Sequence, residues 1–172
     1  MHIRDIFLDG FGRIKEGVPR TIEGLSVEEL ALRPDKEANS IGWLVWHLAR
    51  VQDDHIAGAA GLDQVWFKAG WAKRLDLGLA PEDTGYGHRP TDVERVRASG
   101  EELAAYHEEV SAQTLKFLED LGDQDFDRVV DERWDPPVTL GVRLVSVLED
   151  DAQHLGQAAY LRGLIERRRA GA

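Results

Sequence analysis

The fold of this chain is most clearly predicted by the stretch Asn39-Ser40-Ile41-Gly42-Trp43-Leu44-Val45-Trp46-His47-Leu48. Asn39 and Ser40 carry side-chain oxygens that can accept hydrogen bonds from the first backbone amides of a helix. The apolar residues that follow are dense, so we expect a largely buried helix from about Ile41 to Ala60, ended by Gly61. His47 lies inside this apolar run, and we expect its side chain to point into the helix bundle or toward the open end of the bundle.

Three further segments show helical periodicity. Apolar residues recur at three- and four-residue steps from Ile3 to Ile22, from Thr91 to Leu121 and from Thr139 to Arg167. Pro19 is expected to kink or interrupt the first of these helices. The sequence therefore predicts an all-α fold, a four-helix bundle formed by a single domain over residues 1–172, with a long connection between the second and third helices.

Shorter signals predict how the helices are joined. Ser26-Val27-Glu28-Glu29 and Thr91-Asp92-Val93-Glu94 both match the capping box, in which the first and fourth side chains bond each other's backbone amide. We expect the second box to start the third long helix. The stretch Leu62 to Pro90 reads as a short helix plus an irregular connection, which is typical of a lid or binding loop. We expect no sheet, because Arg128-Val129-Val130 is too short for more than an isolated extended segment.

Composition excludes several classes of site and partner. The chain has no cysteine, which removes disulfides, thiolate metal sites and a cysteine nucleophile. Its net charge of −11 disfavours nucleic acid as a partner. The residues Met1 to Asp5 lack the apolar run of a signal peptide, and the longest stretch without a charged residue, Ala38 to Ala49, is too short to cross a bilayer. We therefore expect a cytoplasmic protein with no membrane partner.

The last helix carries a candidate for chemistry. Asp150 and His154 are four residues apart, so their side chains extend from the same helix face about one turn apart and could coordinate one ion. Arg143 and Gln157 extend this polar strip. Buried ionised carboxylates cost several kcal/mol unless they are paired or bound to a cation. With His47 from the second helix, the strip predicts a three-ligand metal site with an open position, the layout of catalytic zinc.

These three ligands do not determine which metal ion is bound, or whether a metal is bound at all. Two imidazoles and a carboxylate suit zinc, nickel, cobalt or Fe(II). A histidine in a helical core is commonly just hydrogen-bonded, and an Asp/His pair at this spacing can be a local ion pair. The alternative is therefore an internal polar network without a metal.

At these residues the sequence resembles the DinB-like superfamily. The stretch around His47 looks like the start of the family's second helix. The segment from Asp150 to Gly163 looks like its fourth-helix motif, His-x-x-x-His-x-Gly-Gln followed by Leu-Arg. The resemblance implies an up-down-down-up bundle, commonly a homodimer, with a divalent metal held by His47, Asp150 and His154. Asp150 departs from the pattern, since most members have histidine there; the isomerase branch has a carboxylate.

The resemblance also implies a function. The superfamily includes bacillithiol transferases and mycothiol-dependent maleylpyruvate isomerase, so we expect a metal, with zinc or nickel preferred over iron, to activate a low-molecular-weight thiol for reaction with a small electrophilic substrate. Arg143 or Arg50 would hold the anionic end of the thiol cofactor or substrate, and Asp54 would support the ligands. His55 is a weaker ligand candidate, since it lies about 12 Å along the helix from His47.

Two other functional classes compete with this one. The first is a non-enzymatic dimeric stress or ligand-binding bundle whose metal site is degenerate. The second is a DNA-repair protein, suggested only by the superfamily's historical name and disfavoured by the net charge. Of the remaining candidates, we expect His107 to be a hydrogen-bonded core residue and Trp134 to form a pocket wall.

Overall fold

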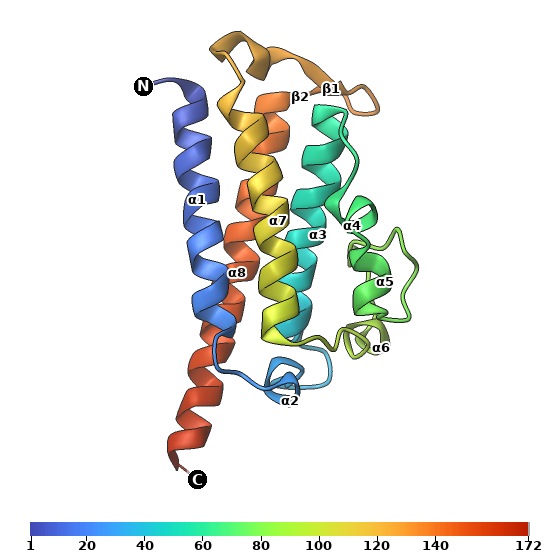
Figure 1. The fold of residues 1–172 in the computed structure, drawn as a ribbon, viewed down its shortest axis with the longest axis vertical. Helices are drawn as coiled ribbons and strands as arrows, with labels where there is room; N and C mark the ends of the chain where they lie inside the picture. Colours follow the sequence, from blue (N-terminus) through green and yellow to red (C-terminus); the bar gives the residue numbers. More distant parts are fainter. Residues whose placement is uncertain (172) are drawn as a thin grey trace.

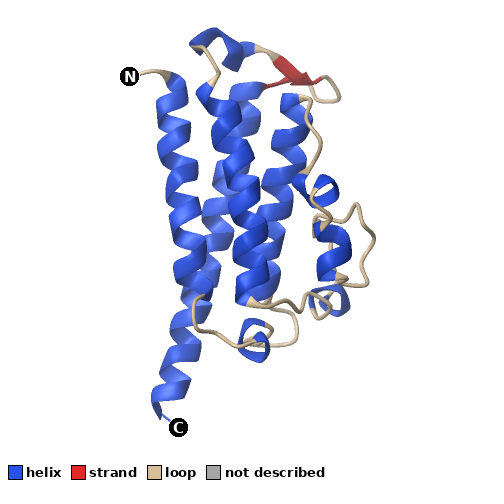
Figure 2. Cartoon of the chain, viewed as in Figure 1, coloured by secondary structure: helices blue, strands red, loops and turns tan. Residues whose placement is uncertain are grey.

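The computed structural model describes residues 1–171, and most of them are helical (Figure 2). Four long helices form the body of the protein: α1 (Ile3–Ile22), α3 (Ile41–Ala60), α7 (Gly100–Glu119) and α8 (Leu140–Gly171). Helix α8 packs against α1 and α3, and α7 packs against the same two helices. In Figure 1, α1 and α8 run downward whereas α3 and α7 run upward. The mostly helical prediction is confirmed.

Short elements join the long ones. Helix α2 (Val27–Leu30) lies between α1 and α3. The connection from α3 to α7 contains three short helices, α4 (Val65–Lys68), α5 (Trp71–Leu75) and α6 (Pro90–Val93), and lies beside α3 in Figure 1. A 3-10 helix, η1 (Asp123–Asp127), follows α7.

A small sheet was not expected. Strand β1 (Val129–Asp131) pairs antiparallel with β2 (Val138–Thr139), with Val129 opposite Thr139. The segment at Val129 that we took as isolated thus finds a partner across the Trp134-containing turn. The pair closes the end of the bundle where α8 begins (Figure 1).

The predicted helix boundaries hold in part. Ser40 caps α3 by accepting from the Trp43 amide at 3.2 Å, and Gly61 ends the helix in the left-handed conformation. Pro19 does not end α1, which continues to Ile22. The predicted start of the third long helix at Thr91 is wrong. The helix begins instead after Ser99, whose hydroxyl accepts from the Glu102 amide while the Glu102 carboxylate accepts from the Ser99 amide.

The core consists of two apolar clusters with polar residues between them. On α3, Ala49 belongs to one cluster and Ile56 to the other; on α8, Ala158 and Val147 divide in the same way. The buried polar side chains that lie between these positions are Arg50, Gln52 and Asp53 on α3, Ser111 and Thr114 on α7, and Asp151 on α8. The candidate ligands on α8 lie at this level of the bundle.

Within residues 1–171, no helix combines the length and apolar composition needed to span a bilayer.

Candidate metal centre

The three predicted ligands converge in the structure. His47 reaches from α3, and Asp150 and His154 reach from adjacent turns of α8, so that one potential ligand atom from each lies within 4.8 Å of the others. His47 Nε2 is 3.9 Å from Asp150 Oδ2, and the imidazole rings of His47 and His154 meet edge to face at 4.6 Å. His47 lies 103 positions before Asp150 in the sequence, yet the fold brings it close enough for one ion to bind all three side chains.

Hydrogen bonds to backbone carbonyls orient both imidazoles. His47 Nδ1 contacts the carbonyl of Thr84, and His154 Nδ1 lies 2.8 Å from the carbonyl of Asp150. A carbonyl only accepts, so each Nδ1 must carry the proton that is donated. In the neutral form of each ring, Nε2 is then left with a free lone pair. Burial lowers the pKa of His154, but its hydrogen bonds to Asp150 outweigh this and the net pKa is raised, so metal binding would release a proton from this ring. A second-sphere acceptor of this kind is what usually fixes a metal-ligating histidine.

Asp150 supplies the observation that most favours a cation. Its Oδ2 atom is buried and makes no hydrogen bond of good geometry among residues 1–171, although this same atom lies 3.3 Å from His154 Nδ1. Burial tends to raise the pKa of Asp150, but the neighbouring His154 and His47 outweigh it and the net pKa is lowered. The group is therefore an anion at neutral pH with an unsatisfied oxygen, which fits a cation held by two nitrogens and one oxygen.

The site is open on one side. The side chain of His47 is 8% exposed, whereas those of Asp150 and His154 are 30% and 18% exposed. Burial is the main cause that lowers the pKa of His47, which keeps its ring neutral and able to bind metal. Three ligands with solvent on one side correspond to a catalytic rather than a structural metal site.

A loop over residues 81–88, called here the covering loop, lies on the ligand face of α3. Its atoms accept hydrogen bonds from four side chains of α3 and α4: Trp66 to the Pro81 carbonyl at 2.8 Å, Arg50 to the Asp83 carbonyl at 3.1 Å, His47 to the Thr84 carbonyl, and Trp43 to His88 Nδ1 at 3.1 Å. Trp43 also stacks on the His47 ring at 4.6 Å. The stretch Leu62 to Pro90 was expected to be a lid or binding loop, but its contacts with the ligand helix were not predictable, because three of the four are made by backbone carbonyls that leave no sequence signature.

Gly85 is the position where the covering loop approaches most closely. Its φ is +99°, a conformation that other residues rarely adopt, and a Cβ built there would lie 2.6 Å from His47 Nδ1 and 3.0 Å from Trp43 Cζ2. Only glycine fits both the backbone geometry and the space beside the metal ligand.

Arg50 is buried in a network of hydrogen bonds. We expected it to hold an anionic ligand, but its side chain is fully buried, lies 3.7 Å from Asp53 and donates to Gln64 and Tyr106 at 3.0 and 3.4 Å. Asp53 also accepts from the first amides of α4, Val65 and Trp66. Arg50 therefore ties α3 to α4 and to the covering loop, and its Nη2 atom is buried without a hydrogen-bond partner among residues 1–171.

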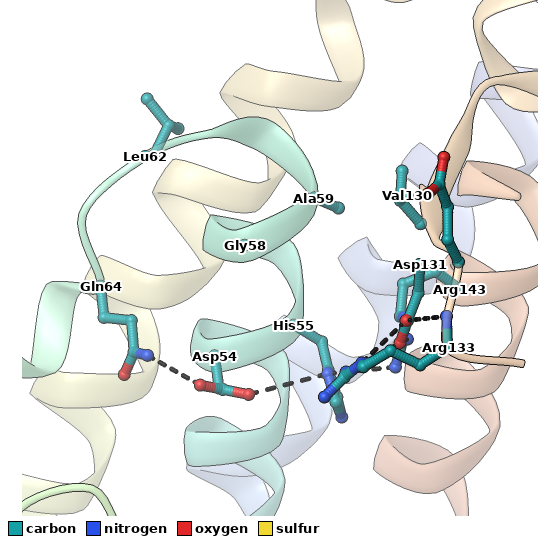
Figure 3. A pocket seen from close by; sticks show the side chains of 11 residues that line it. Asp54, His55, Gly58, Ala59, Leu62, Gln64, Val130, Asp131, Arg133 and Arg143 are labelled. Carbon is teal, nitrogen blue, oxygen red and sulfur yellow. Dashed lines mark hydrogen bonds and ion pairs between the residues drawn. The ribbon is translucent and has the colours of Figure 1, made fainter. Parts of the chain in front are cut away.

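Arg143 lines a polar cavity of about 560 Å³, called here the polar pocket (Figure 3). Its guanidinium contacts His55 Nδ1 at 3.2 Å and donates to Asp131 at 3.0 Å, and Asp131 also binds Arg133. The hydrogen bonds from Arg133 are the largest cause that lowers the pKa of Asp131, so this carboxylate neutralises part of the charge of both arginines. Arg143 is thus placed at a cavity, but already has an acidic partner in β1.

Other predicted residues fall outside the ligand cluster. Asp54 accepts from Gln64 at 2.7 Å and lines the polar pocket with His55 (Figure 3). His107 is buried, contacts Ser111 at 3.3 Å and has its pKa lowered to about 4, mainly by burial, as expected for a core residue. Trp134 is 64% exposed, so the prediction that it packs as a pocket wall is not supported.

Comparisons with known proteins place this geometry in a family. The family model described as DinB superfamily matches residues 13–158. The crystal structure of a conserved protein of a locus from Enterococcus faecalis is similar, with a TM-score of 0.87 and 31% identity over 94% of this chain and 96% of that one. A DinB-like protein from Bacillus cereus has the same fold, with a TM-score of 0.62 and 17% identity over 96% and 91% of the two chains. A search of curated proteins found no match. The chain belongs to the DinB superfamily.

Proposed function

We propose that this protein is a metal-dependent enzyme that activates a low-molecular-weight thiol for transfer to, or isomerisation of, a small electrophile. The observation that carries the proposal is the convergence of His47, Asp150 and His154 around a buried carboxylate oxygen without a hydrogen-bond partner. We take the scaffold to be the family's up-down-down-up bundle, an assignment supported by the helix directions in Figure 1.

The donor set limits the chemistry. A divalent ion, with zinc or nickel preferred and iron as a third choice, would lower the pKa of a bound thiol and keep it as thiolate. The chain has no cysteine, so the thiol must come from outside. The thiol loses its proton and its sulfur forms a bond to an electrophilic carbon. That carbon then releases a leaving group with the bonding electron pair, or a conjugated acceptor takes up a proton.

The chain's own residues would orient this reaction. His47 is held by the Thr84 carbonyl and the stacked Trp43 ring, and Asp150 and His154 are fixed by their common helix. The covering loop and Trp43 lie against one side of His47, which leaves the partly exposed side of Asp150 and His154 for substrates.

We further propose that the polar pocket holds the polar body of the thiol and that Arg143 contributes to it. Arg143 lies seven residues before Asp150 on α8, about 10 Å along the helix axis. Its charge is shared with Asp131, so we expect Arg143 to donate hydrogen bonds to ligand oxygens and to contribute little net attraction for an anion.

The alternative is a non-enzymatic homodimer in which the three residues form an internal network. The contact between His154 and Asp150 favours this alternative, because it partly satisfies the carboxylate without a metal. A homodimer in the cytoplasm fits either function, and apolar side chains exposed on α1 and α8, at Ile3, Ile6, Val142 and Val145, are available for its interface.

A thiol-consumption assay separates the two functions. Zinc- or nickel-loaded protein would be incubated with mycothiol, bacillithiol or glutathione and an electrophile such as 1-chloro-2,4-dinitrobenzene, and the remaining thiol measured. We expect at least one thiol to be consumed at least tenfold faster with wild type than with His154→Ala. Bound metal without acceleration for any of the three thiols would favour the non-enzymatic alternative.

A further inference from the structure

The proposed metal site does not explain two residues of the fourth-helix motif, Gly156 and Gln157, which follow His154 after one intervening residue. Both line an open surface groove of about 410 Å³, called here the apolar pocket, together with Asn39, Leu44, Tyr160 and Leu161. This volume lies within the range of small-molecule sites.

Helix directions place the two pockets on opposite sides of the metal centre. Helices α3 and α8 run antiparallel (Figure 1), so residues before His47 on α3 and after His154 on α8 lie toward the same end of the bundle. Leu44 precedes His47 by three residues and Gln157 follows His154 by three, about 4.5 Å along each helix. The polar pocket, with His55 and Arg143, lies toward the other end.

The two pockets differ in the ligands that they suit. The residues of the apolar pocket include no acidic or basic side chain, although charged residues make up 31% of the chain. Leucine side chains and the Tyr160 ring offer apolar surface, and the amides of Asn39 and Gln157 offer hydrogen bonds. The polar pocket contains three acidic residues and two arginines. Charge complementarity therefore favours an uncharged, largely apolar ligand in the apolar pocket.

We propose that the apolar pocket binds a small uncharged aromatic molecule and serves as the subsite for the electrophile, with the thiol's polar body on the other side of the metal centre. The role as electrophile subsite rests on the thiol chemistry proposed above, whereas the binding of an aromatic ligand does not. In this arrangement Gly156 leaves room for the ligand on the α8 side of the apolar pocket, and Gln157 bonds a polar group on the ligand.

Three helical glycines provide a matched test. An added Cβ would meet no atom within 4 Å at Gly156 in the apolar pocket, at Gly58 in the polar pocket, or at Gly12 on α1. A leucine at each position should therefore be accepted by the fold, and only Gly156→Leu should fill the apolar pocket.

The probe is 4-fluorobenzamide, titrated into ¹⁵N-labelled metal-free protein and followed by amide chemical shifts. We expect shifts confined to the two helix segments around Leu44 and Gly156–Leu161. We expect Gly156→Leu to weaken binding at least tenfold, whereas Gly58→Leu and Gly12→Leu stay within twofold of wild type. Absence of binding, shifts elsewhere, or equal affinity in Gly156→Leu would overturn the proposal. So would shifts at these residues caused by protein concentration alone, which would show that a second copy covers the pocket.

A paramagnetic ion separates this proposal from the proposed function. In cobalt-loaded protein, we expect the fluorine of the bound probe to relax faster than in the zinc-loaded protein. If the probe binds at Gly156 and the protein takes up no metal, the binding site stands and the proposed function fails. If cobalt is bound stoichiometrically and the probe's relaxation is unchanged, the pocket is not the electrophile subsite.

Discussion

Replacing Gly85 with alanine should damage the metal centre from a loop that supplies no ligand. The backbone at Gly85 has φ +99°, and an L-residue held in left-handed backbone costs about 1–2 kcal/mol. The new Cβ would also lie 2.6 Å from His47 Nδ1, and overpacking of this kind costs about 1–3 kcal/mol. Together these costs predict that Gly85→Ala lowers the free energy of unfolding by about 2–5 kcal/mol.

Gly87→Ala is the matched control. Gly87 belongs to the same loop and has φ +73°, but a Cβ there meets nothing within 4 Å. It should show only the backbone cost, about 1–2 kcal/mol. The effect of alanine on the unfolded chain is the same in both variants and cancels in their difference. The difference between the variants therefore reports the contact with His47.

Urea denaturation of the metal-free proteins measures this difference as a shift in midpoint at constant slope. Zinc titration then measures the consequence for the ligand. Disturbing a partner that orients a metal-bound histidine typically costs 10- to 100-fold in affinity, so we expect that loss in Gly85→Ala and a change of about twofold or less in Gly87→Ala. Equal destabilisation and equal zinc affinity in the two variants would refute the role assigned to the covering loop.

Three further predictions concern the scaffold. His107 is buried with its pKa lowered to about 4, whereas in the unfolded chain its pKa is near 6.5. Between pH 6.5 and pH 4, unfolding therefore takes up a proton at His107, and the free energy of unfolding should fall by about 3 kcal/mol as the pH drops through this range. His107→Phe should remove this part of the pH dependence, and an unchanged profile of unfolding free energy against pH would contradict the assignment. Asp53→Asn should cost about 3 kcal/mol, because it leaves Arg50 buried without its anion, and Asp54→Asn, at a more exposed carboxylate, should cost under about 1 kcal/mol. Gly156→Leu should raise the free energy of unfolding by about 0.5–1 kcal/mol through helix propensity, seen as a slightly higher melting temperature, and a clear destabilisation would show that the space at Gly156 is needed by the fold.

The ligand cluster was predictable because its signals are local. Asp150 and His154 share a helix face through their four-residue spacing, and His47 interrupts an apolar run that had to be buried. Ser40 and Gly61 bounded α3 for equally local reasons. The pairing of the two helices came from the resemblance, since periodicity alone does not say which helix packs against which.

The remaining features depend on long-range contacts. The burial of Arg50 was not predictable because its partners, Asp83 and Tyr106, lie 33 and 56 positions away in sequence. The start of α7 was misplaced because both Thr91 and Ser99 begin sequences that match a capping box, and only the fold decides which one opens a long helix. Strand β1 was missed because three residues carry no clear alternation.

Metal content tests the central claim most directly. Wild type, His154→Ala and His55→Ala would be loaded with zinc, passed through a desalting column and measured by elemental analysis and thermal unfolding. His55→Ala is the control, since it removes a histidine from the same face of α3 without touching the cluster. After desalting, we expect about one zinc per chain in wild type and His55→Ala. With free zinc present at 100 times the dissociation constant, we expect both proteins to be stabilised by about 2.7 kcal/mol, seen as a rise of several degrees in melting temperature. His154→Ala should lose both. Wild-type protein that retains no zinc and gains no thermal stability, or a His154→Ala variant that binds as wild type does, would contradict the assignment of His47, Asp150 and His154 as a metal centre.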